Sequence, residues 1–264
     1  MSAPVAIITG AGSGIGYGAA LKLYEMGMAV LGVGRDPAKL ARLEQEIGDP
    51  ARVGVLALDI AHDEAPQRIV EMAMQRWGRI DFLINNAGLG SPKPVHETDD
   101  AMLDEFLGVM LRAPFRLTRD ALAHMKAGSA IINVTSTFAV IGGRRGGAYS
   151  AAKGGMTALT MHLACQYGDQ GIRCNAVAPG VIATPMTEHR FDDQRFRRIN
   201  VEMTPYPRLG VVEDIAGTIG FLCSPAGSFI NGQTIVVDGG WSSTKYISDY
   251  ALETEWTMPE DKQK

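Results

Sequence analysis

The sequence has few cysteines, few aromatic residues and no excess of either charge. Its three cysteines, Cys165, Cys174 and Cys223, are odd in number and lack the spacing of a metal-binding or redox motif. We therefore expect neither a disulfide framework nor a metal site, and we expect these cysteines in the core. The 25 basic and 29 acidic residues give a net charge of −4. Neither sign dominates a long segment, which argues against nucleic-acid or membrane partners.

Long apolar runs and flexible linkers are also missing. No apolar stretch is long enough to span a bilayer, and no charged-then-apolar leader opens the chain. A reduced, cytoplasmic protein is therefore expected. No Pro/Ser linker, block of charge or internal repeat divides the 264 residues, so we expect a single domain over residues 1–264.

The sequence does contain an alternation of short apolar strands and longer helical segments. Strands are expected at 5–8, 29–33, 53–58, 80–84, 131–134, 174–177 and 234–237. Helices are expected at 15–26, from Pro37, at 66–77, at 99–125 with a break near Pro114, from Tyr149, and at 212–222. This order predicts an α/β fold, a doubly wound (Rossmann-type) parallel sheet with helices on both faces.

A glycine-rich loop, T-G-A-G-S-G-I-G, connects the first strand to the first helix. Free backbone N–H groups and the positive end of the helix dipole would face a phosphate at this position. The loop includes Gly10, Ser13, Gly14, Ile15 and Gly16, and its glycines allow a tight turn and a close approach of the backbone to a ligand. The common spacing G-x-G-x-x-G is absent, and a plain flexible turn is the alternative.

The residues after the second and third strands predict how the adenosine end of a dinucleotide would be held. Arg35 follows the second strand, where an arginine accommodates a 2′-phosphate, so NADP is expected over NAD. Asp36 offers two alternatives, because it is either a helix N-cap or a displaced ribose ligand, the latter implying NAD. Asp59, followed by Ile60, stands where the adenine edge would lie.

Tyr149 and Lys153 are the candidate acid–base pair. Their i, i+4 spacing places both side chains on one helix face, where an ammonium would lower the phenol pKa and favour proton exchange near neutral pH. Ser136, at the end of the fifth strand, offers a hydroxyl to a substrate oxygen. The alternative for the pair is a packing ring beside a solvated charge.

Taken together, these motifs resemble the short-chain dehydrogenase/reductase family. The matches are the glycine loop, N-N-A-G at Asn85, Ser136 with Tyr149 and Lys153, N-A-V-A-P-G at Asn175, and V-D-G-G at Val237. The resemblance implies an NAD(P)-dependent oxidoreductase that interconverts a secondary alcohol and a ketone or 3-oxoacyl-type carbonyl. It makes Tyr149 the acid/base, Lys153 its partner and a ribose ligand, and Ser136 the substrate-orienting hydroxyl.

The resemblance also implies cofactor contacts along the remaining strand ends and an oligomeric assembly. The implied contacts are Asn85, Asn86, Ala87, Gly88, Pro179, Gly180, Ile182 and Thr184, the last at the nicotinamide carboxamide. A dimer or tetramer is implied, with small-molecule alcohols or carbonyls as substrates. The apolar side chains of Met156, Leu159 and Leu163 exceed what a sheet-covering helix needs, and we expect them at the interface.

One position departs from the family pattern. Methionine occupies position 110, where the family carries an asparagine that supports a kinked helix and a water leading to the lysine. A thioether accepts hydrogen bonds weakly and donates none. Two alternatives therefore stay open, a catalytically weak cofactor-binding subunit or sensor, and an enoyl-type reductase. The second is disfavoured because enoyl reductases of this fold usually space the Tyr and Lys further apart.

Two segments are expected near the substrate. Residues 188–207, within a lid at about 186–208, are rich in charge and proline and lack a clean helical period, which predicts a mobile lid. The extension 241–264 runs past the last family motif. Its aromatic residues predict packing over the substrate mouth or a neighbouring subunit up to about Met258, followed by a frayed terminus.

Overall fold

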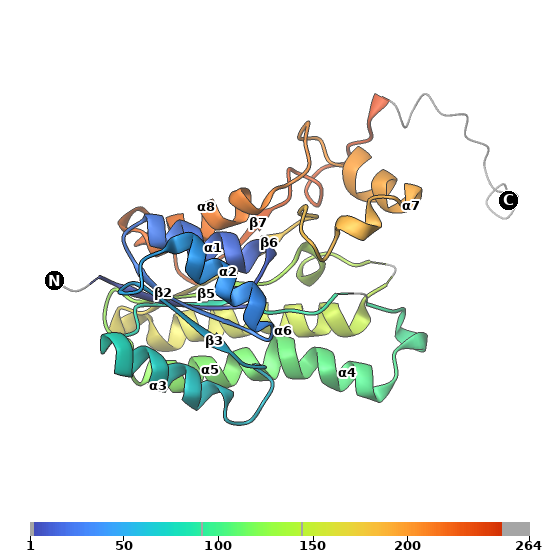
Figure 1. Cartoon of the computed structure of the whole chain (residues 1–264). Coiled ribbons are helices and arrows are strands. Elements are labelled where there is room, and N and C mark those ends of the chain that lie inside the picture. The colour runs from blue at the N-terminus through green and yellow to red at the C-terminus, as the bar shows by residue number, and fades with distance from the viewer. Residues whose placement is uncertain (1–2, 91, 144, 250–264) are drawn as a thin grey trace, which may run out of the picture.

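The computed structural model describes residues 3–90, 92–143 and 145–249. It contains a seven-stranded, fully parallel sheet in the order β3-β2-β1-β4-β5-β6-β7 (Figure 1). The strands are β1 (Val5–Thr9), β2 (Ala29–Gly34), β3 (Val53–Ala57), β4 (Phe82–Asn85), β5 (Ala130–Val134), β6 (Arg173–Pro179) and β7 (Thr234–Val237). The predicted doubly wound α/β fold is thereby confirmed.

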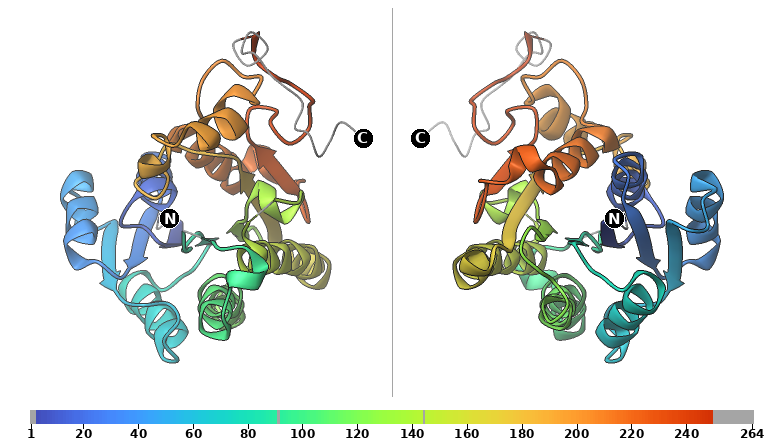
Figure 2. Two further views of the ribbon diagram at one scale, coloured as in Figure 1. Left: turned by 90° about the vertical axis from the view of Figure 1, so that its right-hand side faces the viewer. Right: turned by 90° about the vertical axis from the view of Figure 1, so that its left-hand side faces the viewer.

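Helices cover both faces of the sheet, as the end-on views show (Figure 2). One face carries α1 (Gly14–Glu25), α2 (Pro37–Ile47) and α8 (Val212–Cys223). The other carries α3 (Ala65–Trp77), α5 (Ala113–Leu122) and α6 (Gly147–Tyr167). The central strands are predominantly apolar because successive side chains point to opposite, equally buried faces. In β1, Ala6 and Ile8 pack under α1 and α8, while Ile7 packs under α3 and α5.

The strand order reverses at β1, which lies between β2 and β4. Thr9 joins the ends of β1 and β4, since its hydroxyl accepts the N–H groups of Asn86 (3.0 Å) and Ala87 (3.1 Å). The Asn86 side-chain amide returns a hydrogen bond to the Thr9 carbonyl (2.9 Å). In open α/β sheets ligands bind at such a switch point, beyond the carboxyl ends of the strands.

The helical stretch expected at 99–125 is interrupted one turn earlier than predicted. It consists of α4 (Asp100–Leu107), a π-helical turn at Gly108–Arg112, and α5, in whose first turn Pro114 lies. The Ala113 N–H bonds to the Gly108 carbonyl, five residues back. Proline has no N–H with which to continue an i−4 ladder, so the residues before it widen into a π turn. This turn holds Met110.

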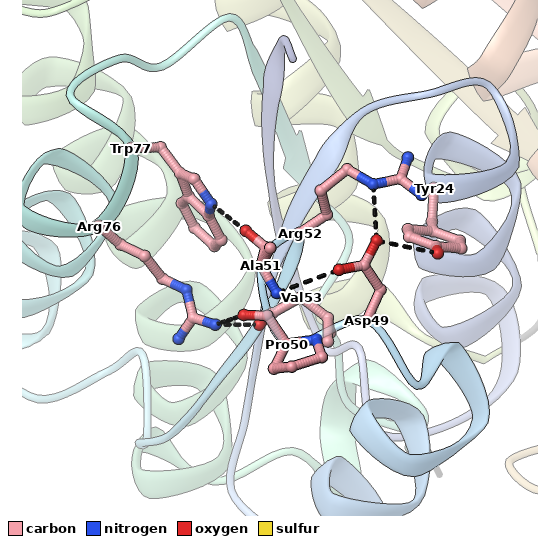
Figure 3. A network of polar contacts seen from close by, with 8 residues as sticks. All are labelled: Tyr24, Asp49, Pro50, Ala51, Arg52, Val53, Arg76 and Trp77. Carbon is pink, nitrogen blue, oxygen red and sulfur yellow. Dashed lines mark hydrogen bonds and ion pairs between the residues drawn. The ribbon is translucent and has the colours of Figure 1, made fainter. Parts of the chain in front are cut away.

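The edge strand β3 is anchored where it begins (Figure 3). The Asp49 carboxylate accepts hydrogen bonds from Arg52 Nε (2.8 Å) and from the Tyr24 hydroxyl of α1 (3.3 Å). From the other face of the sheet, Arg76 and Trp77 of α3 donate to backbone carbonyls of residues 50–53. This network ties both helix layers to the edge of the sheet, at the end opposite the strands' carboxyl termini.

The cysteine prediction was partly wrong. Cys174 and Cys223 are buried, and burial raises the pKa of both thiols to about 12. Cys165 is exposed on α6, because its position on the helix faces away from the sheet. None of the helices among the described residues is long and apolar enough to cross a membrane.

Candidate active site

A cavity of about 400 Å³ opens along the carboxyl ends of the strands, at the switch point. It brings together the glycine loop, the ends of β2 through β6 and the start of α6. The predicted site residues that line it are Gly10, Ser13, Gly14, Ile15, Arg35, Asp59, Ile60, Asn86, Ala87, Gly88, Ser136, Tyr149, Lys153, Pro179, Gly180, Ile182 and Thr184. Residues that are scattered over the sequence therefore meet in one cavity.

Two predicted residues do not line this cavity. Gly16 lies behind the loop, where an added Cβ would be 2.3 Å from the Gly10 carbonyl oxygen and 2.5 Å from the Asn86 amide nitrogen. Only glycine therefore allows α1 to pack this closely on its own loop. Asn85 is buried beneath the cavity floor, and its neighbour Asn86 takes the lining position.

The glycine loop presents the N-terminus of α1 to the cavity. Gly10 and Gly14 have φ of +71° and +54°, a left-handed conformation that other residues rarely adopt. Ser13 is the N-cap of α1, and among the described residues its side chain makes no capping hydrogen bond. The first-turn N–H groups are thus left for a ligand, and the helix dipole favours an anionic one. The residues fit the phosphates of a dinucleotide.

Two cations line the cavity where β2 ends and α2 begins. Arg35 is exposed at the end of β2, and Lys39, in the first turn of α2, also lines the cavity. Asp36 is the N-cap of α2, where its carboxylate accepts the N–H groups of Ala38 (2.9 Å) and Lys39 (3.2 Å). This confirms the N-cap alternative for Asp36. Sequence reasoning missed Lys39, although its place in the first turn of the helix that begins at Pro37 was a signal.

Ser136, Tyr149 and Lys153 lie together at the other end. The Ser136 hydroxyl accepts the Phe138 N–H (3.2 Å), so its own proton remains available to donate. Lys153 is only 5% exposed and donates to the Val134 carbonyl (2.7 Å), with Nζ 6.0 Å from the centre of the Tyr149 ring. The alternative of a solvated lysine is therefore wrong. Phe106 packs edge-on against the same ring.

The pKa values of this pair are set mainly by burial. Burial raises the pKa of the Tyr149 phenol, and a hydrogen bond with Ser136 opposes that rise. Burial lowers the pKa of Lys153 to about 8. We expected the ammonium to lower the phenol pKa, but desolvation is the larger influence on this tyrosine because the interior disfavours its charged form. A hydroxyl donor, a phenol and an ammonium at one cavity end form a set suited to proton transfer at a carbonyl oxygen.

The depressed pKa of Lys153 makes a prediction for stability. An unfolded lysine holds its proton up to about pH 10.4, whereas the folded one releases it near 8, so stability rises with pH across that interval. We expect this rise, at most ~3 kcal/mol in the free energy of unfolding, to be absent in Lys153→Met. Urea denaturation of both proteins between pH 7 and about 10.5 measures the difference. Parallel pH dependences would contradict it.

Met110 is fully buried beside this pair. Its sulfur accepts the Leu89 N–H at 3.5 Å, and an added Cβ on Gly88 would lie 3.6 Å from that sulfur and 3.8 Å from Lys153 Nζ. The thioether thus satisfies one backbone donor but offers the lysine no strong acceptor.

The expected lid carries short helices despite its lack of a clean period. They are Glu188–Arg190, α7 (Gln194–Arg197) and a π-helical turn at Arg198–Glu202, standing beyond the ends of the strands (Figure 1). Met186 and Thr187 line the cavity, which sequence reasoning missed. At the far end of the lid Arg208 pairs with Asp214 through two contacts of 2.7 Å.

The start of the C-terminal extension packs on the lid. The Trp241 indole donates to the Ile199 carbonyl (2.6 Å), and its ring meets Phe138 edge-on with centres 6.0 Å apart. Trp241 therefore connects the lid to the loop that follows Ser136. Tyr246, which also supports the packing prediction, is exposed (39%). The remaining residues behind that prediction, Tyr250, Leu252 and Trp256, lie outside the described residues.

Known proteins resemble this chain over most of its length. Residues 10–242 match the family model described as Enoyl-(Acyl carrier protein) reductase. The chain is 32% identical to 3beta-hydroxysteroid dehydrogenase 2 of Eggerthella lenta, over 92% of this chain and 96% of that protein. It is 36% identical to cis-4-hydroxycyclohexanecarboxylate dehydrogenase of Sinomonas cyclohexanicum, over 90% and 96%.

Solved structures show the same architecture. The crystal structure of levodione reductase superimposes with a TM-score of 0.86 at 31% identity, covering 91% of this chain and 98% of the other. A short-chain dehydrogenase/reductase, a glucose/ribitol dehydrogenase from Brucella melitensis, gives a TM-score of 0.85 at 34% identity, covering 90% and 96%.

Proposed function

Because this chain belongs to the short-chain dehydrogenase/reductase family, we propose that it is an NADP-dependent oxidoreductase that interconverts a secondary alcohol and a ketone. The observation that carries the proposal is the convergence of Ser136, Tyr149 and Lys153 at one end of a 400 Å³ cavity. Other parts of the same cavity are lined by the uncapped N-terminus of α1 and by the cationic side chains of Arg35 and Lys39. The lid and the glycine loop then belong to a single dinucleotide-binding and catalytic domain.

The residues divide the chemistry among themselves. A bound nicotinamide supplies the hydride acceptor for alcohol oxidation and the hydride donor for ketone reduction. Ser136 donates its hydroxyl proton to the substrate oxygen and holds it near the phenol. Tyr149 gives a proton to that oxygen during reduction and takes one during oxidation, and Lys153 stabilises the phenolate. Gly88 lies beside Lys153 Nζ and Thr184 beside Gly14 of the glycine loop, and both would contact the bound cofactor.

The proposal favours alcohol chemistry over enoyl reduction. The matching family model is described as an enoyl reductase, but the relatives cited above are named for oxidation at a hydroxyl group. Both names refer to ring substrates, so alicyclic ketones and alcohols belong first in a substrate panel. The i, i+4 spacing of Tyr149 and Lys153 supports the same choice.

The deciding experiment is a panel of secondary alcohols, ketones and 2-enoyl thioesters, with NADP and NAD in turn. Turnover of an alcohol or ketone, with no reduction of the enoyl thioesters, is the expected result. Cofactor binding without turnover across the panel would favour a sensor. In that case Met110→Asn, which restores an amide beside Lys153, separates an impaired enzyme from a protein that has no catalytic role.

We also propose a homo-oligomer, most simply a tetramer. Met156 and Leu163, which we had expected at an interface, are buried within the chain. Phe115 on α5 and Met161 on α6 are instead half exposed (50% and 54%) on the outer helix layer. We expect light scattering to give a multiple of 28.3 kDa, and Phe115→Glu with Met161→Glu to reduce it. A wild-type monomer at micromolar concentration would refute the proposal.

The contact of Trp241 with the lid predicts a role in substrate binding. Trp241→Phe keeps an aromatic ring against Phe138 but removes the hydrogen bond to Ile199, worth about 0.5–1.5 kcal/mol. We expect KM for the substrate to rise by roughly 2- to 10-fold with little change in cofactor affinity. Trp77→Phe, on the far side of the sheet, is the matched control. Unchanged KM in Trp241→Phe would separate the lid from substrate binding.

A further inference from the structure

A second, much smaller cavity lies behind Lys153. Its volume is about 10 Å³, and it is closed in by residues from β1, β4, β5, the π-helical turn and α6. This volume suffices for one water molecule, which also needs at least two polar partners. Thr9, Asn85 and Lys153 supply the polar side chains among the lining residues. The Thr9 hydroxyl already accepts hydrogen bonds from two backbone N–H groups, so Asn85 and Lys153 are the side chains left to bind a water molecule.

The orientation of the Asn85 carboxamide follows from a chain of buried hydrogen bonds. Thr160 donates its hydroxyl proton to the Met156 carbonyl (2.8 Å), so it must accept from the Asn133 amide nitrogen (2.8 Å). The carboxamide oxygen of Asn133 therefore faces Asn85 and accepts a hydrogen bond from the Asn85 amide nitrogen (2.8 Å). The second amide hydrogen of Asn85 goes to the Thr118 hydroxyl (3.1 Å).

The carboxamide oxygen of Asn85 is consequently left over. This oxygen is buried, since Asn85 is only 5% exposed, and it has no hydrogen-bond partner among the described residues. An unpaired buried acceptor is costly, and such atoms are commonly satisfied by an ordered water. Across the cavity, the Lys153 ammonium has three protons to donate, one of which goes to Val134. Met110 cannot compensate, because its sulfur faces the Leu89 N–H.

We propose that Asn85 is a positioning residue for Lys153, and that its carboxamide oxygen holds one water molecule in the small cavity against the ammonium group. The water donates to the Asn85 oxygen and accepts from Nζ, so the buried charge keeps part of its hydration. In a chain with methionine at position 110, the strand end thus supplies the polar group that the helix lacks. The catalytic consequence rests on the proposed function, but the water's position does not.

The test measures the titration of Lys153 itself. Lysine labelled with ¹³C at Cε gives one NMR signal per lysine, and Lys153→Met identifies the signal of interest. In the wild type that signal should titrate near pH 8. Asn85→Leu, similar in size but without the oxygen, should lower the titration midpoint by about 1–2 on the pH scale, since a hydrogen bond to a charged group is lost. Asn85→Asp places a carboxylate there and should raise it.

Thr118→Val is the matched control. It removes a partner of the same Asn85 amide on the side away from the cavity, so it disturbs the network and leaves the carboxamide oxygen in place. We expect the Lys153 midpoint to stay where it is in this variant. A Lys153 midpoint that does not move in Asn85→Leu, or that moves the same way in Leu and Asp variants, would overturn the proposal. If Asn85→Leu fails to fold, the direction in which the midpoint moves in Asn85→Asp decides.

A rate measurement then links the water to catalysis. At pH 7 the alcohol oxidation rate of Asn85→Leu should fall by roughly 2- to 10-fold, because a midpoint lowered from about 8 to between about 7 and 6 reduces the ionised fraction of Lys153 from about nine-tenths to between about one half and one tenth. The NMR titration needs neither substrate nor cofactor, so the two proposals can fail separately. If the Lys153 midpoint moves down in Asn85→Leu and up in Asn85→Asp but the wild type turns over no substrate, the proposed oxidoreductase activity is refuted and the position of the water stands.

Discussion

Tyr149→Phe should lower turnover by about 10²- to 10⁴-fold, the contribution of a positioned general acid or base. The substitution removes one hydroxyl and keeps the ring packed against Phe106. Because the phenol acts on the substrate oxygen, affinity for the cofactor should be nearly unchanged. Steady-state kinetics on any substrate from the panel, with cofactor binding measured by fluorescence titration, tests both halves.

The pH dependence of the wild type supplies an independent check. Burial raises the pKa of Tyr149, so the phenolate needed for alcohol oxidation forms only as pH rises. The oxidation rate should therefore increase with pH up to about 8, where Lys153 begins to lose its proton and the rise should level off, whereas ketone reduction, which needs the protonated phenol, should decline as pH rises. Tyr149→Phe should abolish both trends. Activity that survives in this variant would remove the tyrosine from the mechanism.

Arg35→Ala should remove a preference for NADP over NAD of roughly 10- to 150-fold. A charge-assisted hydrogen bond to the 2′-phosphate is worth about 1.5–3 kcal/mol, which corresponds to that range. Arg35 is exposed where β2 ends at the cavity, and Asp36, which would otherwise select the 2′-hydroxyl, is engaged as the N-cap of α2. The ratio of kcat/KM for the two cofactors measures the preference.

A substitution at Lys39 distinguishes the effect of any positive charge near the 2′-phosphate from the specific effect of Arg35. It lines the same end of the cavity, so Lys39→Ala should also weaken NADP binding, by less than Arg35→Ala because an ammonium makes no paired contacts with a phosphate. Arg42 is also on α2 but does not line the cavity, so Arg42→Ala should leave the affinity for both cofactors unchanged. A preference for NAD that persists in Arg35→Ala would refute the assignment and return attention to Asp36.

The sequence by itself determined the order of strands and helices and most of the site. Short apolar runs alternating with amphipathic helices allow a parallel sheet covered on both faces, because strands buried on both sides carry no polar face. Motifs at strand ends then had to meet at one edge, and all the predicted site residues except Gly16 and Asn85 line the cavity there. These features follow from local chain geometry, which sequence spacing encodes.

The tertiary structure decided what depends on contacts between distant segments. Whether Asp36 caps a helix or holds a ribose, and whether Lys153 is solvated, depends on which backbone groups lie within hydrogen-bond distance. Met156 and Leu163 were misassigned to an interface because an apolar helix face is the same in sequence whether a sheet or another subunit covers it. The unpaired oxygen of Asn85 arises from a hydrogen-bond chain through β4, β5 and α6, and no single segment of sequence carries that information.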